Sequence, residues 1–275
     1  MMSALMLALL AQAAPASGAE ADILDALRNR PKREAAPVPA ALPRPSRLAR
    51  CAALAESDPE TALDDAQKLR EGAQDSLELA HSAHCLGLAL VQLGRLAEAR
   101  TAFEMAGDEA PVTEPAYRAR LAGLAGNVAL AEGRADLALP LLAGAVETAR
   151  PAAEPALSAG LMLDQARALV ALSRLDEAAS LLGAARAAHA ADSQAWLLSA
   201  TLARRQDRLA EAQGFIEQAA LLAPADPAIG LEAGVIAALA GRDSAARASF
   251  ASVIAAAPES EEAVQAQAYL AQLGQ

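Results

Sequence analysis

The sequence has very few aromatic residues: 275 residues include 3 Phe, 2 Tyr and 1 Trp, which together make 2% of the chain. Runs of β-branched and aromatic residues with period-two alternation, the pattern of strands, are also missing. The apolar share is nevertheless 54%, and the bulk of it is Ala and Leu at helical spacing. Because Ala and Leu lose little conformational freedom in a helix, the sequence predicts an all-α fold.

Lysine is almost absent as well, since it occurs only at Lys32 and Lys68, and the net charge is −11. Nucleic-acid binding requires a basic face that neutralises several phosphates. Here the acidic residues are interspersed among the arginines along the expected helices. We therefore expect no nucleic-acid partner, and the charge mainly favours solubility.

The known catalytic signatures are missing too. No Gly-rich phosphate loop follows a strand, and the sequence contains neither a Gly-x-Ser-x-Gly elbow nor a His-Glu-x-x-His pair. Acidic pairs such as Asp64-Asp65 and Glu261-Glu262 are adjacent on expected helices, so their carboxylates cannot face each other as an acid-base pair requires. We expect a protein that is not an enzyme and that uses no cofactor.

Long hydrophobic runs are also lacking. The apolar run from Leu5 to Ala11 is well short of the ~20 residues that cross a bilayer. Residues 1–19 look like a secretory signal peptide with small-residue cleavage sites, after Ala13, Ala14 or Ala19. The alternative is an uncleaved apolar tail or short anchor. We expect an exported, bacterial periplasmic protein whose mature chain has no transmembrane span.

Proline dominates the next segment, residues 20–45, where five of the 15 prolines lie between Pro31 and Pro45. Proline removes backbone donors and disfavours helix at the residue before it, so we expect a disordered or extended linker. Residues 20–30 could form a short amphipathic helix with Ile23, Leu24 and Leu27 on one side. Such a helix would be a docking peptide or a lid for the protein's own groove, or else a frayed leader without a specific role.

Between Ser193 and Pro258 one pattern occurs twice, 34 residues apart. With Ser193 and Pro227 as position 1, alanine occupies position 20 in both copies, Ile216 and Phe250 share position 24, and proline occupies position 32. With Trp196 at position 4, this pattern resembles the tetratricopeptide repeat (TPR). The resemblance implies a right-handed α-solenoid of stacked antiparallel helix pairs over residues 46–274, with five to six units and a capping helix at 261–273.

Six units can be registered by starting at residues 43, 80, 119, 159, 193 and 227. Alanine occupies position 20 in all six, where only a small side chain lets the second helix press onto the first: Ala62, Ala99, Ala138, Ala178, Ala212 and Ala246. Position 8, on the first helix, is small in five units, whereas the first unit has Arg50 there. Glycine at position 15 in three units predicts the end of the first helix, at Gly94, Gly133 and Gly241.

The two cysteines, Cys51 and Cys85, fall on the first helices of neighbouring units. In TPR proteins the corresponding positions face the same spot on the concave groove, so the resemblance implies that the two thiols lie close together. In an exported protein this arrangement suggests a disulfide that fastens the weak first unit to the second. His81 and His84 precede Cys85, and a His-His-Cys-Cys metal site is the alternative; we expect no metal, because a disulfide would consume both thiols.

The same resemblance implies a binding groove, which TPR proteins build chiefly from positions 2, 5, 9, 12 and 13 of the first helices. In this sequence those columns give an apolar surface with a basic centre, and the candidate contacts are His84, Leu88, Arg120, Asn127, Leu130, Arg167, Leu197, Thr201, Arg204 and Arg205. Arginines in a row suit a peptide carboxylate or an acidic segment. The alternative is that pairs such as Arg120/Glu114 and Arg205/Asp207 are only surface ion pairs.

The sequence therefore predicts a non-enzymatic interaction module or scaffold that binds a segment of another protein in a concave groove. The alternative is a structural spacer or assembly subunit that acts through its ends, its convex face or its N-terminal tail. The identity of the partner does not follow from the fold.

Overall fold

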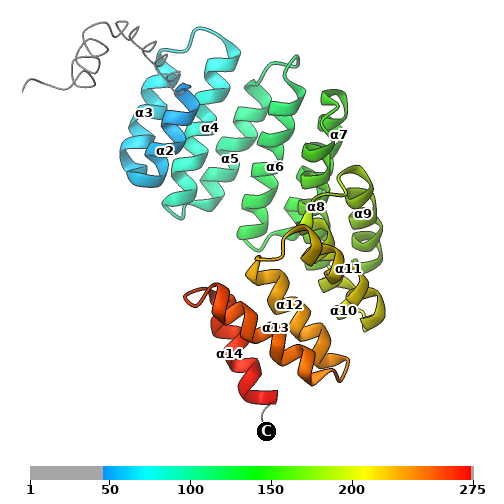
Figure 1. The fold of residues 1–275 in the computed structure, drawn as a ribbon. Coiled ribbons are helices and arrows are strands. Elements are labelled where there is room, and N and C mark those ends of the chain that lie inside the picture. The colour runs from blue at the N-terminus through cyan, green and yellow to red at the C-terminus, as the bar shows by residue number, and fades with distance from the viewer. Residues whose placement is uncertain (1–45, 274–275) are drawn as a thin grey trace, which may run out of the picture. The chain divides into compact units, whose positions relative to one another are not determined.

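The computed structural model describes residues 46–273, and these residues form helices with no strand. The expected signal peptide (1–19) and proline-rich segment (20–45) lie outside the described residues. In order, the α-helices are α2 (Arg47–Ser57), α3 (Pro59–Glu71), α4 (Ser76–Gln92), α5 (Leu96–Glu109), α6 (Pro115–Ala131), α7 (Ala135–Ala149), α8 (Pro155–Ala171), α9 (Leu175–Ala188), α10 (Ser193–Arg205), α11 (Leu209–Leu222), α12 (Pro227–Leu239), α13 (Asp243–Ala256) and α14 (Glu261–Leu273). Figure 1 shows their succession along the chain.

The helices alternate as first and second members of six antiparallel pairs, from α2 with α3 to α12 with α13, and α14 follows as a single last helix. The all-α solenoid and its C-terminal helix are thereby confirmed. The surplus over 34 residues falls mainly in the first helices, since α4, α6 and α8 have 17 residues each whereas α10 and α12 have 13. The connections add little: residues 110–114 join α5 to α6, and the short helix η1 (Arg150–Ala152) lies between α7 and α8. The expectation that the proline-containing turns hold the surplus is therefore wrong, because α6 and α8 begin at the second proline of each turn.

Helix starts follow local sequence signals. The side chains of Ser46, Asp58, Asp75, Asp192 and Asp226 accept hydrogen bonds from backbone N–H groups in the first turns of the helices that follow them. Proline is the first residue of α3, α6, α8 and α12, where a missing N–H costs nothing. In the later units these signals stand at the starts of first helices and mark where a unit begins. In the first unit they also mark the start of its second helix, α3.

Each first helix from α4 onward ends in a left-handed residue at position 15. Gly94, Gly133 and Gly241 have φ of 70°, 74° and 70°, as glycine at a helix end predicts. Ser173 and Asp207 take the same conformation, with φ of 60° at both, although they carry a side chain. The N–H group of the following residue then bonds back into the helix, for example from Arg95 to the Leu90 carbonyl at 2.9 Å. This bond closes the turn into the second helix.

Position 20 is fully buried in every unit, since all six alanines have 0% exposure. Positions 8 and 24 are matched in size. A Cβ atom added to Gly87 would lie 2.6 Å from the Phe103 ring, and one added to Gly126 would lie 2.5 Å from Leu142. In the fourth and fifth units alanine at position 8 is paired with Leu182 or Ile216. The two helices of a pair therefore approach closely because one side chain is small where its neighbour is large.

The first unit departs from this register. A single residue, Asp58, joins α2 to α3, whereas three residues join the two helices of each later pair. With the shorter turn, Cys51 and Ala55 are the buried residues of α2, and Arg50 is exposed. The register that puts Arg50 at position 8, where the other units have a small residue, is therefore wrong. That register assumes a three-residue turn between the two helices of the first unit.

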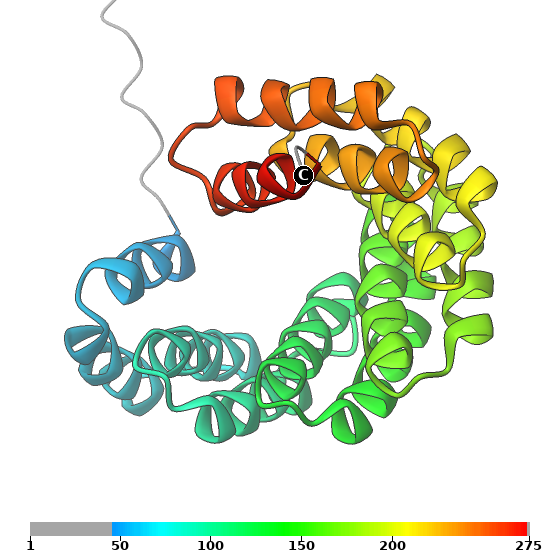
Figure 2. The ribbon, with the colours of Figure 1, turned by 90° about the horizontal axis from the view of Figure 1, so that it is seen from below.

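The stack of residues 46–273 curves, and the first helices lie on its inner side (Figure 2). Contacts between units agree with this placement: α6 touches α8, α10 touches α12, and α12 touches α14. Within the described part of the chain no comparable contact joins two second helices. The first helices therefore form the concave surface on which the sequence places the groove.

Candidate functional site

The concave surface has a small hollow between α8 and α10. Its volume is about 160 Å³, and it is lined by Ala166, Arg167 and Val170 of α8, by Leu198, Thr201, Leu202 and Arg205 of α10, and by Leu182. Arg167, Val170, Thr201 and Arg205 belong to the groove columns that the TPR resemblance singles out. The structure therefore brings three of the expected groove contacts, Arg167, Thr201 and Arg205, together around one apolar depression.

The two neighbouring arginines at the end of α10 differ in their surroundings. Arg204 makes a two-point ion pair with Glu232 of α12, with Nε–Oε1 at 2.6 Å and Nη2–Oε2 at 3.2 Å. Its side chain is only 24% exposed. Arg205 is exposed and forms no ion pair with a described residue, so the suggested pair with Asp207 does not occur. Arg205 rather than Arg204 is the cation that a ligand in the hollow can reach.

Another part of the groove is a polar cluster between α6 and α8. Asn127 donates a hydrogen bond to Oδ2 of Asp164 at 2.8 Å, and Arg167 donates to the other carboxylate oxygen of Asp164. The carboxylate of Asp164 is therefore held between an amide and a guanidinium group. Arg167 remains 45% exposed at its side chain and can contact a ligand while it pairs with Asp164.

Arg120 lies nearer the start of α6 and pairs with Glu154 at 2.6 Å, across the connection between two units. The surface ion pair of Arg120 with Glu114, which the sequence analysis gives as an alternative, therefore does not form. The stacking instead brings the Glu154 carboxylate, just before α8, to the guanidinium group. Both side chains are about half exposed, at 52% and 45%, so the pair contributes little to stability.

His84 belongs to a cluster of rings between α4, α5 and α6. Its Nδ1 lies 3.1 Å from the hydroxyl of Tyr117, and its ring centroid lies 5.8 Å from those of Phe103 and Tyr117. Burial, with a smaller contribution from the nearby charge of His81, lowers the pKa of His84 to about 4. His84 is therefore neutral at neutral pH. Its contacts with Phe103 and Tyr117 stabilise the junction of α4, α5 and α6, and the rest of its ring is available to a ligand. Burial also raises the pKa of Tyr117.

The three leucines of the expected groove are placed differently. Leu88 and Leu130 are partly buried and pack against the cores of their own units. Leu197 is only 8% exposed and packs in the core cluster that contains Ile229. Leu197 thus stabilises the junction of α10 and α12, and its side chain offers little surface to a ligand.

The cysteines are joined. The structure has a disulfide between Cys51 on α2 and Cys85 on α4, with Cα atoms 5.8 Å apart. Ala66 of α3 packs directly against the bridge. Since position 24 is alanine only in this unit, the bridge fills the space that Phe103 or Leu142 fills elsewhere. The thiols are thus not available to His81 and His84, and the described residues contain no group of three or more His, Cys, Asp or Glu side chains suited to a metal ion.

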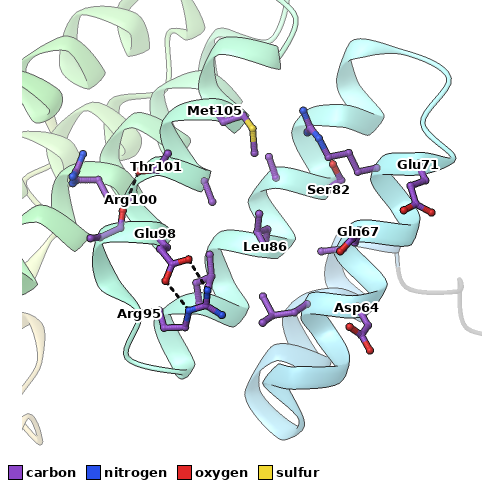
Figure 3. A pocket seen from close by; sticks show the side chains of 17 residues that line it. Asp64, Gln67, Glu71, Ser82, Leu86, Arg95, Glu98, Arg100, Thr101 and Met105 are labelled. Atoms are coloured by element: carbon purple, nitrogen blue, oxygen red, sulfur yellow. Dashed lines mark hydrogen bonds and ion pairs between the residues drawn. The ribbon is translucent and has the colours of Figure 1, made fainter.

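A second, larger hollow lies on the other side of the first helices, and sequence reasoning missed it. Figure 3 shows it between α3 and α5, with α4 as its floor, and its volume is about 920 Å³. Ala83 lines it at position 4, where the fifth unit has Trp196, so a small side chain stands where a large ring would occupy space. This alanine is the feature of the sequence from which the hollow could have been inferred, although it belongs to no motif.

None of the helices between residues 46 and 273 is both long enough and apolar enough to cross a bilayer.

Comparisons with known proteins agree with the repeat. No family model matches the chain, and a search of curated proteins finds no match. Among solved structures, the TPR protein TTC0263 from Thermus thermophilus has a TM-score of 0.55 and 22% identity, over 70% of this chain and 98% of that one. The pilF protein of Pseudomonas aeruginosa has a TM-score of 0.60 and 14% identity, over 81% and 97%.

A third similar structure is MamA of Desulfovibrio magneticus RS-1, from residue 41 to its end, with a TM-score of 0.53 and 15% identity over 66% of this chain and 97% of that one. Likeness at such identities shows a shared fold. The described chain thus has the tetratricopeptide-repeat fold.

Proposed function

We propose that this protein is a non-enzymatic binding module that holds an acidic or carboxylate-bearing segment of another polypeptide on its concave surface. The observation that carries the proposal is the hollow between α8 and α10, which combines apolar walls with the exposed Arg205. Val170 and Leu198 suit an apolar side chain of the ligand, and a guanidinium group binds a carboxylate in two-point fashion. Arg167 lies on the opposite wall and supplies a second cation.

The test uses single substitutions because the neighbouring arginines are not equivalent. Reversing Arg204 would leave Glu232, whose side chain is 12% exposed, without its partner, so a loss of binding could reflect damage to the fold. Arg205→Glu changes an exposed side chain and leaves that ion pair intact. The matched control is Arg208→Glu, since Arg208 is also an exposed arginine in the same unit but does not line the hollow.

Both variants and the parent chain would be used for affinity purification from a bacterial envelope extract, with mass spectrometry of the captured proteins. We expect a partner that the parent and Arg208→Glu retain and that Arg205→Glu loses. Overlapping synthetic peptides of that partner would then identify the bound segment, which should contain an acidic residue or a C-terminal carboxylate beside an apolar side chain. Equal capture by all three proteins would show that this hollow is not the site.

The alternative function, a spacer or assembly subunit, has one observation in its favour. The outer hollow between α3 and α5 is larger than the concave one, so a partner could bind the convex face. Capture that survives Arg205→Glu and fails on substitution of the outer hollow would favour this alternative.

We also propose that the protein is exported and that the Cys51–Cys85 bridge forms in the periplasm. The expected signal peptide at residues 1–19 supports export, and the joined cysteines suit an oxidising compartment. Fractionation of the cells should find the chain in the periplasm. The intact mass of that material should increase by about two hydrogens on reduction, whereas an unchanged mass would rule the bridge out.

A further inference from the structure

The outer hollow of residues 46–273 differs from the concave groove in its charge. Three arginines on its rim already have carboxylate partners: Arg70 pairs with Glu109, Arg95 with Glu98, and Arg100 with both Glu104 and Glu132. Asp64 and Glu71, on α3, also line the hollow and have no cationic partner among the described residues. The lining thus contains three arginines and three carboxylates, but all three arginines are paired, and only the carboxylates of Asp64 and Glu71 lack an opposite charge.

The hollow has an apolar floor and partly apolar walls. Leu86 and Leu90 of α4 line its floor, and its walls include Leu63 of α3 and Ala97 and Met105 of α5. Figure 3 shows Leu86 at the centre, Glu71 and Met105 toward one end, and Asp64 and Arg95 toward the other. A volume of about 920 Å³ lies at the upper end of the range of ligand pockets, roughly 300–1,000 Å³. A single small side chain would therefore leave most of it empty.

The spacing of the two unpaired carboxylates indicates the form of the ligand. Asp64 and Glu71 are seven residues apart on one helix, which corresponds to two turns and about 10 Å along its axis. A helix lying parallel to α3 presents side chains seven residues apart at the same spacing. The walls are themselves two helices packed on a third, and the gap left by small side chains between them suits another helix.

We propose that the hollow between α3 and α5 binds a basic amphipathic helix of a partner protein. Leucine-like side chains of that helix lie on Leu86 and Leu63, and Arg or Lys residues two turns apart pair with Asp64 and Glu71. This site is independent of the concave hollow and prefers the opposite charge. One chain can therefore hold an acidic segment on its inner face and a basic helix on its outer face, and so bring two partners together.

The test uses two synthetic helical peptides of about 14 residues with the same leucine stripe. One has Arg and Lys on its polar face, with two of them seven positions apart, and the other has Glu at the same positions. We expect the basic peptide to bind the parent protein in fluorescence anisotropy, more weakly as salt is raised, and the acidic peptide to bind at least roughly tenfold less.

Two substitutions locate the binding. Ala97 is exposed on the rim, so Ala97→Trp places a large ring in the opening of the hollow without entering the core, and Asp64→Lys with Glu71→Lys reverses the two unpaired charges. The matched controls are Ala210→Trp, which changes the same repeat position in the fifth unit, and Glu217→Lys with Glu259→Lys, which makes the same charge change at exposed residues of later units that do not line the hollow. We expect each hollow variant to weaken the basic peptide at least roughly tenfold, with the controls unchanged and all circular dichroism spectra alike.

Three results would overturn the proposal. Equal binding of both peptides would show that the charge does not select the ligand. Binding that survives Ala97→Trp, or that Arg205→Glu abolishes, would place the peptide elsewhere. If the parent protein itself dimerises in sedimentation experiments and Ala97→Trp makes it monomeric, the hollow holds a second copy of this chain and not a basic partner.

Discussion

The first unit and the later ones hold their helices together differently. In the second, third and sixth units a glycine on the first helix faces a large side chain of the second, Phe103, Leu142 or Phe250. In the first unit the corresponding space between α2, α3 and α4 contains Ala66 and the Cys51–Cys85 bridge. The later units are thus fixed by packed side chains, whereas the first is fixed mainly by a covalent bond. The difference shows that a repeat at the end of a stack, with a neighbour on one side only, needs another source of stability.

The largest expected effect is that of removing the covalent bond. The substitutions Cys51→Ala and Cys85→Ala together should lower the free energy of unfolding of the first unit by about 3–4 kcal/mol, because the bridge closes a loop of 34 residues in the unfolded chain. Hydrogen exchange measured by mass spectrometry should become faster in α2 and α3 and stay unchanged in α10 to α13. Reduction of the parent protein is the matched control and should reproduce the pattern. Equally faster exchange in all units would contradict the comparison.

The second prediction concerns the packed units. Gly87→Ala should destabilise the protein by roughly 1–3 kcal/mol, because the new Cβ would lie 2.6 Å from the buried Phe103 ring. Adding Phe103→Leu should recover part of the loss, since the fourth unit combines Ala166 with Leu182. Urea unfolding of the parent, both single variants and the double variant gives the coupling energy between the two positions. If the effects of Gly87→Ala and Phe103→Leu on the free energy of unfolding are strictly additive, the match in size between these two residues does not stabilise the packing of α4 on α5.

The third prediction tests the junction of the first units through pH. His84 has an ordinary pKa of about 6.5 when unfolded and about 4 when folded, so the folded state disfavours its protonated form. The contribution of the neutral His84 ring to the free energy of unfolding is fully present above about pH 6.5. It is lost as the pH falls toward 4, at a rate of at most roughly 1 kcal/mol per pH unit.

Urea unfolding between about pH 7.5 and about pH 4.5 should therefore show a steeper loss for the parent than for His84→Gln, which has no titrating ring. The control is His189→Gln, which removes a histidine at the end of α9, outside this ring cluster, and should follow the parent. Parallel curves for the parent and His84→Gln would mean that the ring is already charged in the folded protein.

The sequence predicted what the repeat itself specifies. Alanine at position 20 in all six units and glycine at position 15 in three are local signals, and they placed the helix pairs, although the register of α2 in the first unit was wrong. It failed where the outcome depends on two units at once. The ion pair of Arg204 with Glu232 joins residues 28 apart in the chain, and the burial of Leu197 depends on how α12 stacks on α10. The outer hollow arises from side chains that are too small to fill a space, which no positive motif marks.

The smallest expected effect lies in the turns. Asp207 has φ of 60°, where a residue with a side chain is strained and glycine is not, and Gly241 holds the same position in the sixth unit. Asp207 makes no ion pair with a described residue, so Asp207→Gly should remove the strain at little other cost. We expect a gain of about 0.5–1 kcal/mol in the free energy of unfolding, measured with urea. The matched control is Gly241→Ala, which introduces the strain and should lower stability by a similar amount. If Asp207→Gly is neutral while Gly241→Ala is harmful, the loss of backbone freedom on folding offsets the strain at Asp207, and the two turns are equivalent in shape but not in energy.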